Sequence, residues 1–366
     1  MKITLDKNEF LSAVQTAERF TSGRLNTSAA LQGVYINAKD DVIDIRATDL
    51  NVHCHIVITG KIDEPGGQIF ESKRVLEFLQ LLQNGNIDLE EKDGTLKISQ
   101  GNTKGAFPTL PTEEYPLPPT LKGTKQNLKT DLFIKNMPRL LFSASSDDAR
   151  PVLTGVNFVA NESVLTLVAT DGFRLSVTKE KTMKDFSSMI VPAAFLREVM
   201  KICKGKKTTD FIYSPEEKMV MFGTEEIKLY SRLIEGEFPP YERVVPEERK
   251  TVVRVGKDDL MRNTKLISIF ARDFSNVVLY NFTKEGLILS PKKEANEDNT
   301  TKQEIQIEGP DIKVAFNYRY VIDLLNNISS EEVVIELLRP DAPVLFKSPK
   351  DDTFFHIIMP VRIQEE

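Results

Sequence analysis

The sequence has no tryptophan, and its 366 residues include only two cysteines and three histidines. Cys54 and Cys203 belong to no C-x-x-C pair, which excludes zinc ribbons and dithiol redox motifs. We expect both to be small buried side chains in a reducing compartment, which predicts a cytoplasmic protein.

Long apolar runs are also missing. The longest stretch without a charged residue, 25–38, has 14 residues and is rich in Asn, Ser, Thr and Gln. A membrane helix needs about 20 apolar residues, so no membrane association is predicted. The first residues, Met-Lys-Ile-Thr-Leu-Asp, lack the apolar segment of a secretory signal.

Net positive charge is absent as well. The chain carries 48 Lys and Arg against 54 Asp and Glu, a formal charge of −6. This balance argues against a histone-like or tail-driven nucleic-acid binder. With 40% hydrophobic and 28% charged residues, the composition excludes disorder and collagen-like repeats.

The chain contains an internal repeat. Residues 45–49 (Ile-Arg-Ala-Thr-Asp) recur 122 positions later at 167–171 (Leu-Val-Ala-Thr-Asp), and Tyr115-Pro116 recurs as Phe238-Pro239. A third, diverged copy is visible at 314–325. Such periodicity indicates repeated structural units. We predict three domains, at 1–122, 123–247 and 248–366.

Each predicted unit has the order helix, strands, helix, strands. Apolar residues at three-and-four spacing predict six helices: 7–20, 72–83, 131–143, 192–204, 257–271 and 317–327. Alternating segments such as 42–46 and 164–168 predict strands. Pro138 should kink its helix, Pro192 should lie in a first helical turn, and the polar run 292–302 should be a loop. The fold class is therefore α+β, with two helices per domain packed on antiparallel sheets.

Charge is distributed unevenly. The helical segments with their immediate ends carry 17 Lys and Arg against 8 Asp and Glu, a net +9. Because the whole chain carries −6, the remainder carries −15. A basic helical surface suits a phosphate backbone, although ordinary solvated helix faces explain any single helix equally well.

The repeat number suggests a ring. A domain of this size has a diameter of roughly 35 Å. Six such bodies in a ring leave a hole wider than a DNA duplex, whereas three leave almost none. We therefore expect two chains to pair head to tail as a homodimer.

The sequence resembles the β subunit of bacterial DNA polymerase III, the sliding-clamp family, over its full length. The resemblance is carried by five motifs: Arg-Pro-Val-Leu-Thr-Gly-Val at 150–156, Ala-Thr-Asp-Gly-Phe-Arg-Leu at 169–175, Phe-Pro-Pro-Tyr-Glu-Arg-Val-Val-Pro at 238–246, Phe-Asn-Tyr-Arg-Tyr-Val at 316–321 and Met-Pro-Val-Arg at 359–362. It implies a non-catalytic dimeric ring, without cofactor or metal, that encircles duplex DNA regardless of sequence. Its implied partners are the DNA polymerase III alpha subunit, the clamp loader and repair proteins.

The resemblance also implies a groove between the second and third domains that binds short linear peptides. Its residues would be Leu153, Thr170, Gly172, Phe173, Arg174, Leu175, Pro239, Arg243, Val244, Asn317, Tyr320, Ile357, Met359, Pro360, Val361 and Arg362. Arg174 and Arg362 would hold a peptide carboxylate or carbonyl. The competing interpretation is that Leu153, Leu175 and Val244 are simply core residues. Phe173 stands where the family commonly has histidine, which makes the site more apolar.

DNA and subunit contacts are predicted less directly. Arg24 matches a DNA-contacting loop position of the family. Helix charge adds Lys73, Arg74, Arg150, Arg197, Lys201, Lys204, Lys206 and Lys207. For the dimer interface we predict Phe78 and Phe107 against Ile269 and Phe270, with ordinary core burial as the alternative.

The sequence contains no convincing catalytic or metal-binding motif. Gly205-Lys-Lys-Thr208 has the tail of a phosphate loop, but Met200 stands where its first glycine belongs. His53 and His55 would need a third metal ligand, and the sequence does not establish Asp49 as one. The rival hypotheses are an enzyme that acts on nucleic acid and an adaptor that binds peptides without encircling DNA. The sequence does not separate a main replicative clamp from a second clamp serving repair.

Overall fold

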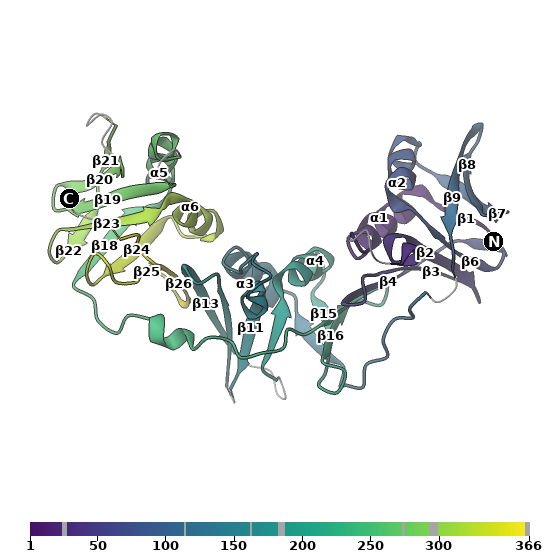
Figure 1. Cartoon of the computed structure of the whole chain (residues 1–366), viewed down its shortest axis with the longest axis horizontal. Coiled ribbons are helices and arrows are strands. Elements are labelled where there is room, and N and C mark those ends of the chain that lie inside the picture. The colour runs from purple at the N-terminus through teal and green to yellow at the C-terminus, as the bar shows by residue number, and fades with distance from the viewer. Residues whose placement is uncertain are drawn as a thin grey trace. The chain divides into compact units, whose positions relative to one another are not determined.

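The structure is a computed structural model that describes residues 1–23, 28–112, 115–161, 163–181, 187–272, 275–292 and 299–362. In these ranges a strand, a helix, several strands, a second helix and further strands follow one another three times (Figure 1). Every strand pairing described is antiparallel. The α+β class and the threefold repetition are thus confirmed.

The first repeat consists of β1 (Lys2–Asp6), α1 (Lys7–Glu18), the 3-10 turn η1 (Ala29–Gln32), β2 (Val34–Lys39), β3 (Val42–Thr48), β4 (Val52–Ile58), β5 (Lys61–Glu64), β6 (Gly66–Phe70), α2 (Ser72–Leu81), β7 (Asn86–Lys92), β8 (Thr95–Gln100) and β9 (Thr103–Leu110).

The second repeat consists of β10 (Gln126–Lys129), α3 (Asp131–Leu141), η2 (Pro151–Thr154), β11 (Gly155–Ala160), β12 (Val164–Thr170), β13 (Arg174–Lys181), β14 (Met189–Pro192), α4 (Ala193–Cys203), β15 (Thr208–Ser214), β16 (Met219–Gly223) and β17 (Ile227–Arg232), followed by η3 (Tyr241–Val244).

The third repeat consists of β18 (Thr251–Gly256), α5 (Lys257–Ala271), β19 (Val277–Thr283), β20 (Gly286–Pro291), β21 (Thr301–Gln303), β22 (Gln306–Glu308), β23 (Ile312–Asn317), α6 (Tyr318–Asn327), β24 (Glu332–Leu337), β25 (Val344–Ser348) and β26 (Asp351–Ile358).

Helix starts follow local chemistry. The Asp6 carboxylate caps α1 by accepting from the backbone N–H groups of Asn8 and Glu9, both at 2.9 Å. Asn317 caps α6 in the same way through Arg319 N at 3.1 Å. Asp131 and Asp258 lie in the first turns of α3 and α5, where the helix dipole favours negative charge.

Two local predictions need correction. Pro192 ends β14 instead of starting a helix; it pairs with Gly155 on an edge strand, where a missing N–H is tolerated. Pro138 lies inside α3, and the predicted kink there stays a prediction. In the predicted loop 292–302, Thr301–Gln303 forms β21 against β20, while 293–298 lie outside the described residues.

The chain divides into two compact units, 1–130 with 198–233, and 131–197 with 234–366. In the first unit β4 pairs with β17, so one 13-stranded sheet combines strands of two repeats. In the second unit β13 pairs with β26, which gives a 9-stranded sheet beside a four-stranded one. The middle repeat therefore contributes strands to the largest sheet of each unit.

Paired helices cover the sheets within each unit. α1 packs against α2, and α5 packs against α6 (Figure 1). Beneath α5 and α6 the rings of Tyr280, Phe316 and Phe346 form a chain of edge-on contacts with centroids 5.3 and 5.8 Å apart. Cys54 and Cys203 are buried and free, and burial raises the pKa of the Cys203 thiol to about 11. In the described ranges, none of the helices combines the length and apolarity that a bilayer crossing demands.

Candidate functional site

The turn between β12 and β13 forms one wall of a cavity. Thr170 Oγ1 donates to the carbonyl of Arg174 at 2.6 Å and accepts from Gly172 N at 3.0 Å. Asp171 Oδ1 accepts from the N–H groups of Phe173 and Arg174. Gly172 has φ +93°, and a Cβ there would lie 3.1 Å from Arg150 Nη1. Glycine therefore suits both the left-handed backbone and the close approach.

A second wall, adjacent to this turn, comes from the end of β26. Met359 N donates to the carbonyl of Phe173 at 2.8 Å, directly after the β13–β26 pairing that sets Leu175 opposite Ile357. The segment that contains η3 supplies the third side. The backbone of three distant segments thus fixes the cavity, and side-chain packing completes it.

The cavity has a volume of about 210 Å³ and a mostly apolar lining. Its lining residues are Leu153, Thr170, Gly172, Arg174, Leu175, Pro239, Pro240, Tyr241, Val244, Ile357 and Met359. Leu153 and Leu175 are 6% and 4% exposed, so they belong to the core and also form part of the cavity surface. The alternative interpretations of these two leucines are therefore compatible.

Arg174 is already engaged by this chain. Its Nε lies 3.0 Å from Asp171 Oδ2, and its Nη1 lies 2.6 Å from Asp323 Oδ2. The guanidinium also lies over the rings of Tyr320 and Phe142, at 4.6 and 5.4 Å from their centroids. Two carboxylates and two rings occupy the group. Arg174 therefore holds the wall together through Asp171 and Asp323, and its contact with a peptide carboxylate or carbonyl stays a prediction.

Seven predicted groove residues do not line this cavity. Phe173 is 57% exposed on the turn itself, and Arg243 is exposed on η3. Asn317 caps α6, Tyr320 covers Arg174, and Val361 packs on the cluster of Val277, Leu279 and Ala315. Pro360 is half-buried beside Met359, and Arg362 lines a separate cavity.

Sequence reasoning missed four residues here. Pro240 and Tyr241 line the cavity, and both belong to the Phe-Pro-Pro-Tyr-Glu-Arg-Val-Val-Pro motif at 238–246. Asp171 and Asp323 hold Arg174; Asp171 is part of the 169–175 motif, but Asp323 carries no local signal because it lies 149 positions away.

The candidate DNA contacts occupy varied positions. Lys73 and Arg74 are exposed on α2, and Arg197 and Lys201 are exposed on α4. Lys204, Lys206 and Lys207 follow the end of α4 and are exposed. Arg24 lies outside the described residues. Arg150 is not on an α-helix: it precedes η2, pairs with Asp147 at 2.9 Å and approaches Gly172 beside the cavity. Arg150 therefore lies at the rim of the cavity, and its contact with DNA stays a prediction.

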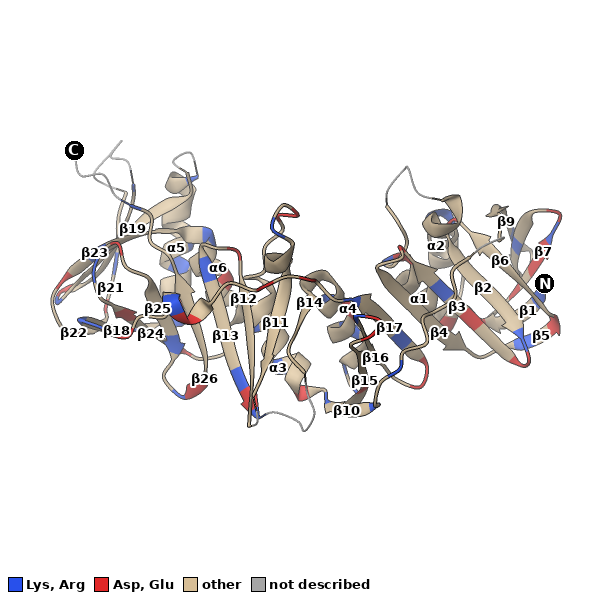
Figure 2. Cartoon of the chain, turned by 60° about the horizontal axis from the view of Figure 1, so that its bottom comes forward, with Lys and Arg blue, Asp and Glu red and all other residues tan. Residues whose placement is uncertain are grey.

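The helices themselves carry only part of this positive charge. The observed helices carry 11 Lys and Arg against 8 Asp and Glu, a net +3, whereas the predicted helical segments with their immediate ends carry +9. The difference of six arises because α1 ends at Glu18, α4 at Cys203 and α5 at Ala271, so six of the basic residues counted with the ends come after the helices. Figure 2 shows basic residues on helices of both units and acidic residues at many strand ends and turns.

The four candidate interface residues divide into two pairs. Ile269 and Phe270 are 55% and 44% exposed on α5, which rules out ordinary core burial for them. Phe78 and Phe107 are half-buried and form an edge-on pair with centroids 5.5 Å apart.

One histidine of the predicted pair bonds to a carboxylate on a neighbouring strand. His55 Nε2 lies 2.6 Å from Asp44, which also accepts from Arg46. Hydrogen bonding and charge from these two partners lower the pKa of the Asp44 carboxyl against the opposing effect of its burial. Among the described residues no group of three His, Cys, Asp or Glu side chains is arranged to hold a metal ion.

Comparisons with known proteins agree along the whole chain. Three family models match in succession: DNA polymerase III beta subunit, N-terminal domain (1–119), central domain (127–240) and C-terminal domain (242–362). The beta sliding clamp of Bacillus subtilis is 26% identical over 379 residues, covering 99% of this chain and 100% of that protein. The beta sliding clamp of Staphylococcus epidermidis is 27% identical, with 99% of each chain covered.

Solved structures share the fold. The DNA polymerase III beta subunit of Thermotoga maritima superposes with a TM-score of 0.92 at 24% identity, covering 99% of this chain and 100% of that one. The Bacillus subtilis sliding clamp gives 0.90 at 25% identity, with both chains fully covered. With three successive domains matched at full length, the chain belongs to the family of the DNA polymerase III beta subunit, the sliding clamp, an accessory subunit of the polymerase.

Proposed function

We propose that this chain is a DNA sliding clamp in which two copies close a head-to-tail ring around duplex DNA. The observation that carries the proposal is the full-length match of three successive clamp domains. The clamp tethers DNA polymerase III and repair proteins to the template in the cytoplasm and catalyses no reaction. In this proposal the three domains span 1–122, 123–247 and 248–366.

The apolar cavity beside Gly172 is the proposed docking site for partners. A short extended peptide suits it because the lining offers apolar surface from four segments and few charges. The polymerase alpha subunit, the clamp loader and repair proteins each present such a peptide in this proposal. Met359 is suited to several partners, since its unbranched side chain adapts its shape.

A topological experiment tests the ring. The protein is loaded by a clamp loader onto nicked circular DNA, and retention is measured by gel filtration before and after linearisation. A ring stays on the circle and slides off the linear molecule. Equal retention on both forms, or binding of peptide without any loading, would leave an adaptor that does not encircle DNA.

Peptide binding tests the groove separately. Fluorescence anisotropy of a labelled polymerase-tail peptide should show about tenfold weaker binding for Met359→Ala, because truncating a central apolar contact costs about 1–2 kcal/mol. Arg362→Ala, which alters a different cavity, is the matched control and should bind normally. Unchanged affinity of Met359→Ala would place the site elsewhere.

A further inference from the structure

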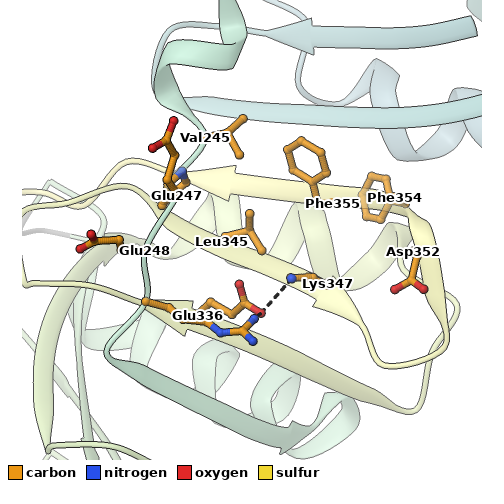
Figure 3. Close-up of a pocket in the computed structure, with 11 residues that line it drawn as sticks. Val245, Glu247, Glu248, Glu336, Leu345, Lys347, Asp352, Phe354 and Phe355 are labelled. Carbon is orange, nitrogen blue, oxygen red and sulfur yellow. Dashed lines mark hydrogen bonds and ion pairs between the residues drawn. The ribbon is translucent and has the colours of Figure 1, made fainter. Parts of the chain in front are cut away.

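A second, larger cavity adjoins the groove in the same unit. Its volume is about 520 Å³. Residues 245–249, directly after η3, form one side, and strands β24, β25 and β26 form the other. Figure 3 shows the side chains of Val245, Leu345 and Phe355 bordering the space between the linking segment and the strands, with Glu247 and Glu248 along the segment.

The two cavities share one apolar strip. Ile357 lines the groove, and Phe355, two positions earlier on the same strand, lines the second cavity. Residues i and i+2 of a strand face the same side. On β25, Leu345 is opposite Ile357 and Lys347 is opposite Phe355. Val245, Leu345 and Phe355 belong to one packed cluster with Leu175 and Ile357. A chain that leaves the groove along β26 therefore reaches the second cavity.

The second cavity has excess negative charge. Its lining holds four carboxylates against two cations. Glu336 alone engages both cations, Arg249 at 2.5 Å and Lys347 at 2.8 Å. The other three carboxylates, Glu247, Glu248 and Asp352, are exposed and form no ion pair within the described part of the chain. An apolar floor with unpaired carboxylates at its rim complements a side chain with an aliphatic stem and a cationic head.

We propose that this cavity binds lysine or arginine residues that flank the groove peptide in the same partner segment. The stem of such a residue packs on Leu345 and Phe355, and its charge meets the carboxylates of Glu247, Glu248 and Asp352. The inference rests on the proposed peptide groove and adds to it a preference for basic flanking sequence. Partners would then differ in affinity through residues outside the groove motif.

The test uses the labelled polymerase-tail peptide with Lys-Lys or Glu-Glu added at one end, both ends being tried. At low salt, Lys-Lys at the end that leads along β26 should tighten binding about three- to tenfold, because each exposed ion pair adds a small favourable contribution. The variant Glu247→Gln/Glu248→Gln/Asp352→Asn should lose this gain and still bind the unextended peptide normally. The control Glu304→Gln/Glu308→Gln/Glu331→Gln makes the same charge change outside the cavity and should retain the gain.

The outcomes separate this inference from the groove itself. Equal affinity for the Lys-extended and Glu-extended peptides would overturn the proposed role of the second cavity and leave the groove unaffected. An affinity gain that survives in the cavity variant would do the same. If both triple variants lose the affinity gain, the gain comes from the overall charge of the protein. That result would also overturn the proposed role of the second cavity. Failure of the unextended peptide to bind the wild type would overturn the groove, and this inference with it.

Discussion

At the scale of single residues, the first repeat reproduces the groove turn with one substitution. Thr48 Oγ1 accepts from Leu50 N, and Asp49 Oδ1 accepts from Asn51 N and Val52 N, as Thr170 and Asp171 do in the second repeat. Leu50 therefore stands where Gly172 stands. It has φ +77° and is 49% exposed. A leucine in the left-handed region carries backbone strain of about 1–3 kcal/mol.

Replacing Leu50 should relieve this strain. Leu50→Asn should raise the stability of the first unit by about 0.5–1 kcal/mol, because asparagine tolerates the left-handed region. Thermal unfolding followed by calorimetry should show a rise of roughly 2 °C. Leu50→Ala is the matched control and should give no rise, since alanine keeps the strain. Equal rises in both variants would attribute the effect to the removed apolar surface.

At the scale of elements, a buried polar chain crosses the β13–β26 pairing. Ser143 Oγ lies 2.8 Å from Ser176 Oγ, which lies 2.8 Å from His356 Nδ1. His356 is fully buried, and its Nε2 has no hydrogen-bond partner in the described ranges. Burial, with a smaller contribution from the charge of Arg174, lowers the pKa of His356 to about 3.

Acid should therefore loosen this pairing. The unfolded histidine takes up a proton near pH 6.5, whereas the folded one stays neutral down to about pH 3, so stability is complete above pH 6.5 and falls below it. Between pH 7 and 5 the loss is about 2 kcal/mol, or about 25-fold in hydrogen-exchange protection of β13 and β26 amides. His356→Gln should abolish that pH dependence. If the protection of this variant still falls with pH to the same extent, the pH dependence belongs to other titratable groups.

A second contact in the same unit should respond only at lower pH. Arg139 is buried and pairs with Asp351 at 2.6 Å and with Ser329 at 3.0 Å. Hydrogen bonds from Thr353 and Arg139 lower the pKa of the Asp351 carboxyl despite its partial burial. The Asp351 carboxylate therefore contributes to the stability of the fold above about pH 4, and this contribution is lost below that pH. Between pH 6.5 and 4, the pH dependence of stability therefore reports on His356 without a contribution from the Arg139–Asp351 pair.

At the scale of the whole molecule, the proposed ring depends on α5 of one copy meeting α2 and β9 of another. Ile269 and Phe270 expose large apolar side chains that a monomer has no reason to leave in water, and Leu266 on the same helix is 45% exposed. The Phe78–Phe107 pair offers an aromatic surface of the kind enriched at interface centres.

Charging that surface should separate the copies. Ile269→Lys/Phe270→Lys should convert a dimer into a 41.4 kDa monomer in multi-angle light scattering at micromolar concentration, because burying an unpaired charge costs several kcal/mol. Leu117→Lys, at another exposed leucine, is the control and should stay dimeric. Peptide binding should survive in both variants. A dimer that persists after the double substitution would contradict the proposed interface.

Most of the fold was predictable from the sequence, and only part of the site. Apolar periodicity located all six described helices, with ends correct to within two residues, because a helix that buries one face must repeat its apolar residues at helical spacing. The sequence did not show that Lys204, Lys206 and Lys207 lie past the end of α4, because periodicity does not fix that boundary. It also did not place Arg150 beside Gly172, because the two residues are distant in sequence.

The sequence by itself determined the repeat, the element order and the family, because these depend on local patterning and on spacing along one chain. Only the tertiary structure showed that Asp323, 149 positions away, already holds Arg174. It also revealed the second cavity beside the groove, with Glu336 engaging both of its cations. Long-range strand pairing, such as β13 with β26, brings such groups together, and the partner that a charge finds there decides whether it remains available to a ligand.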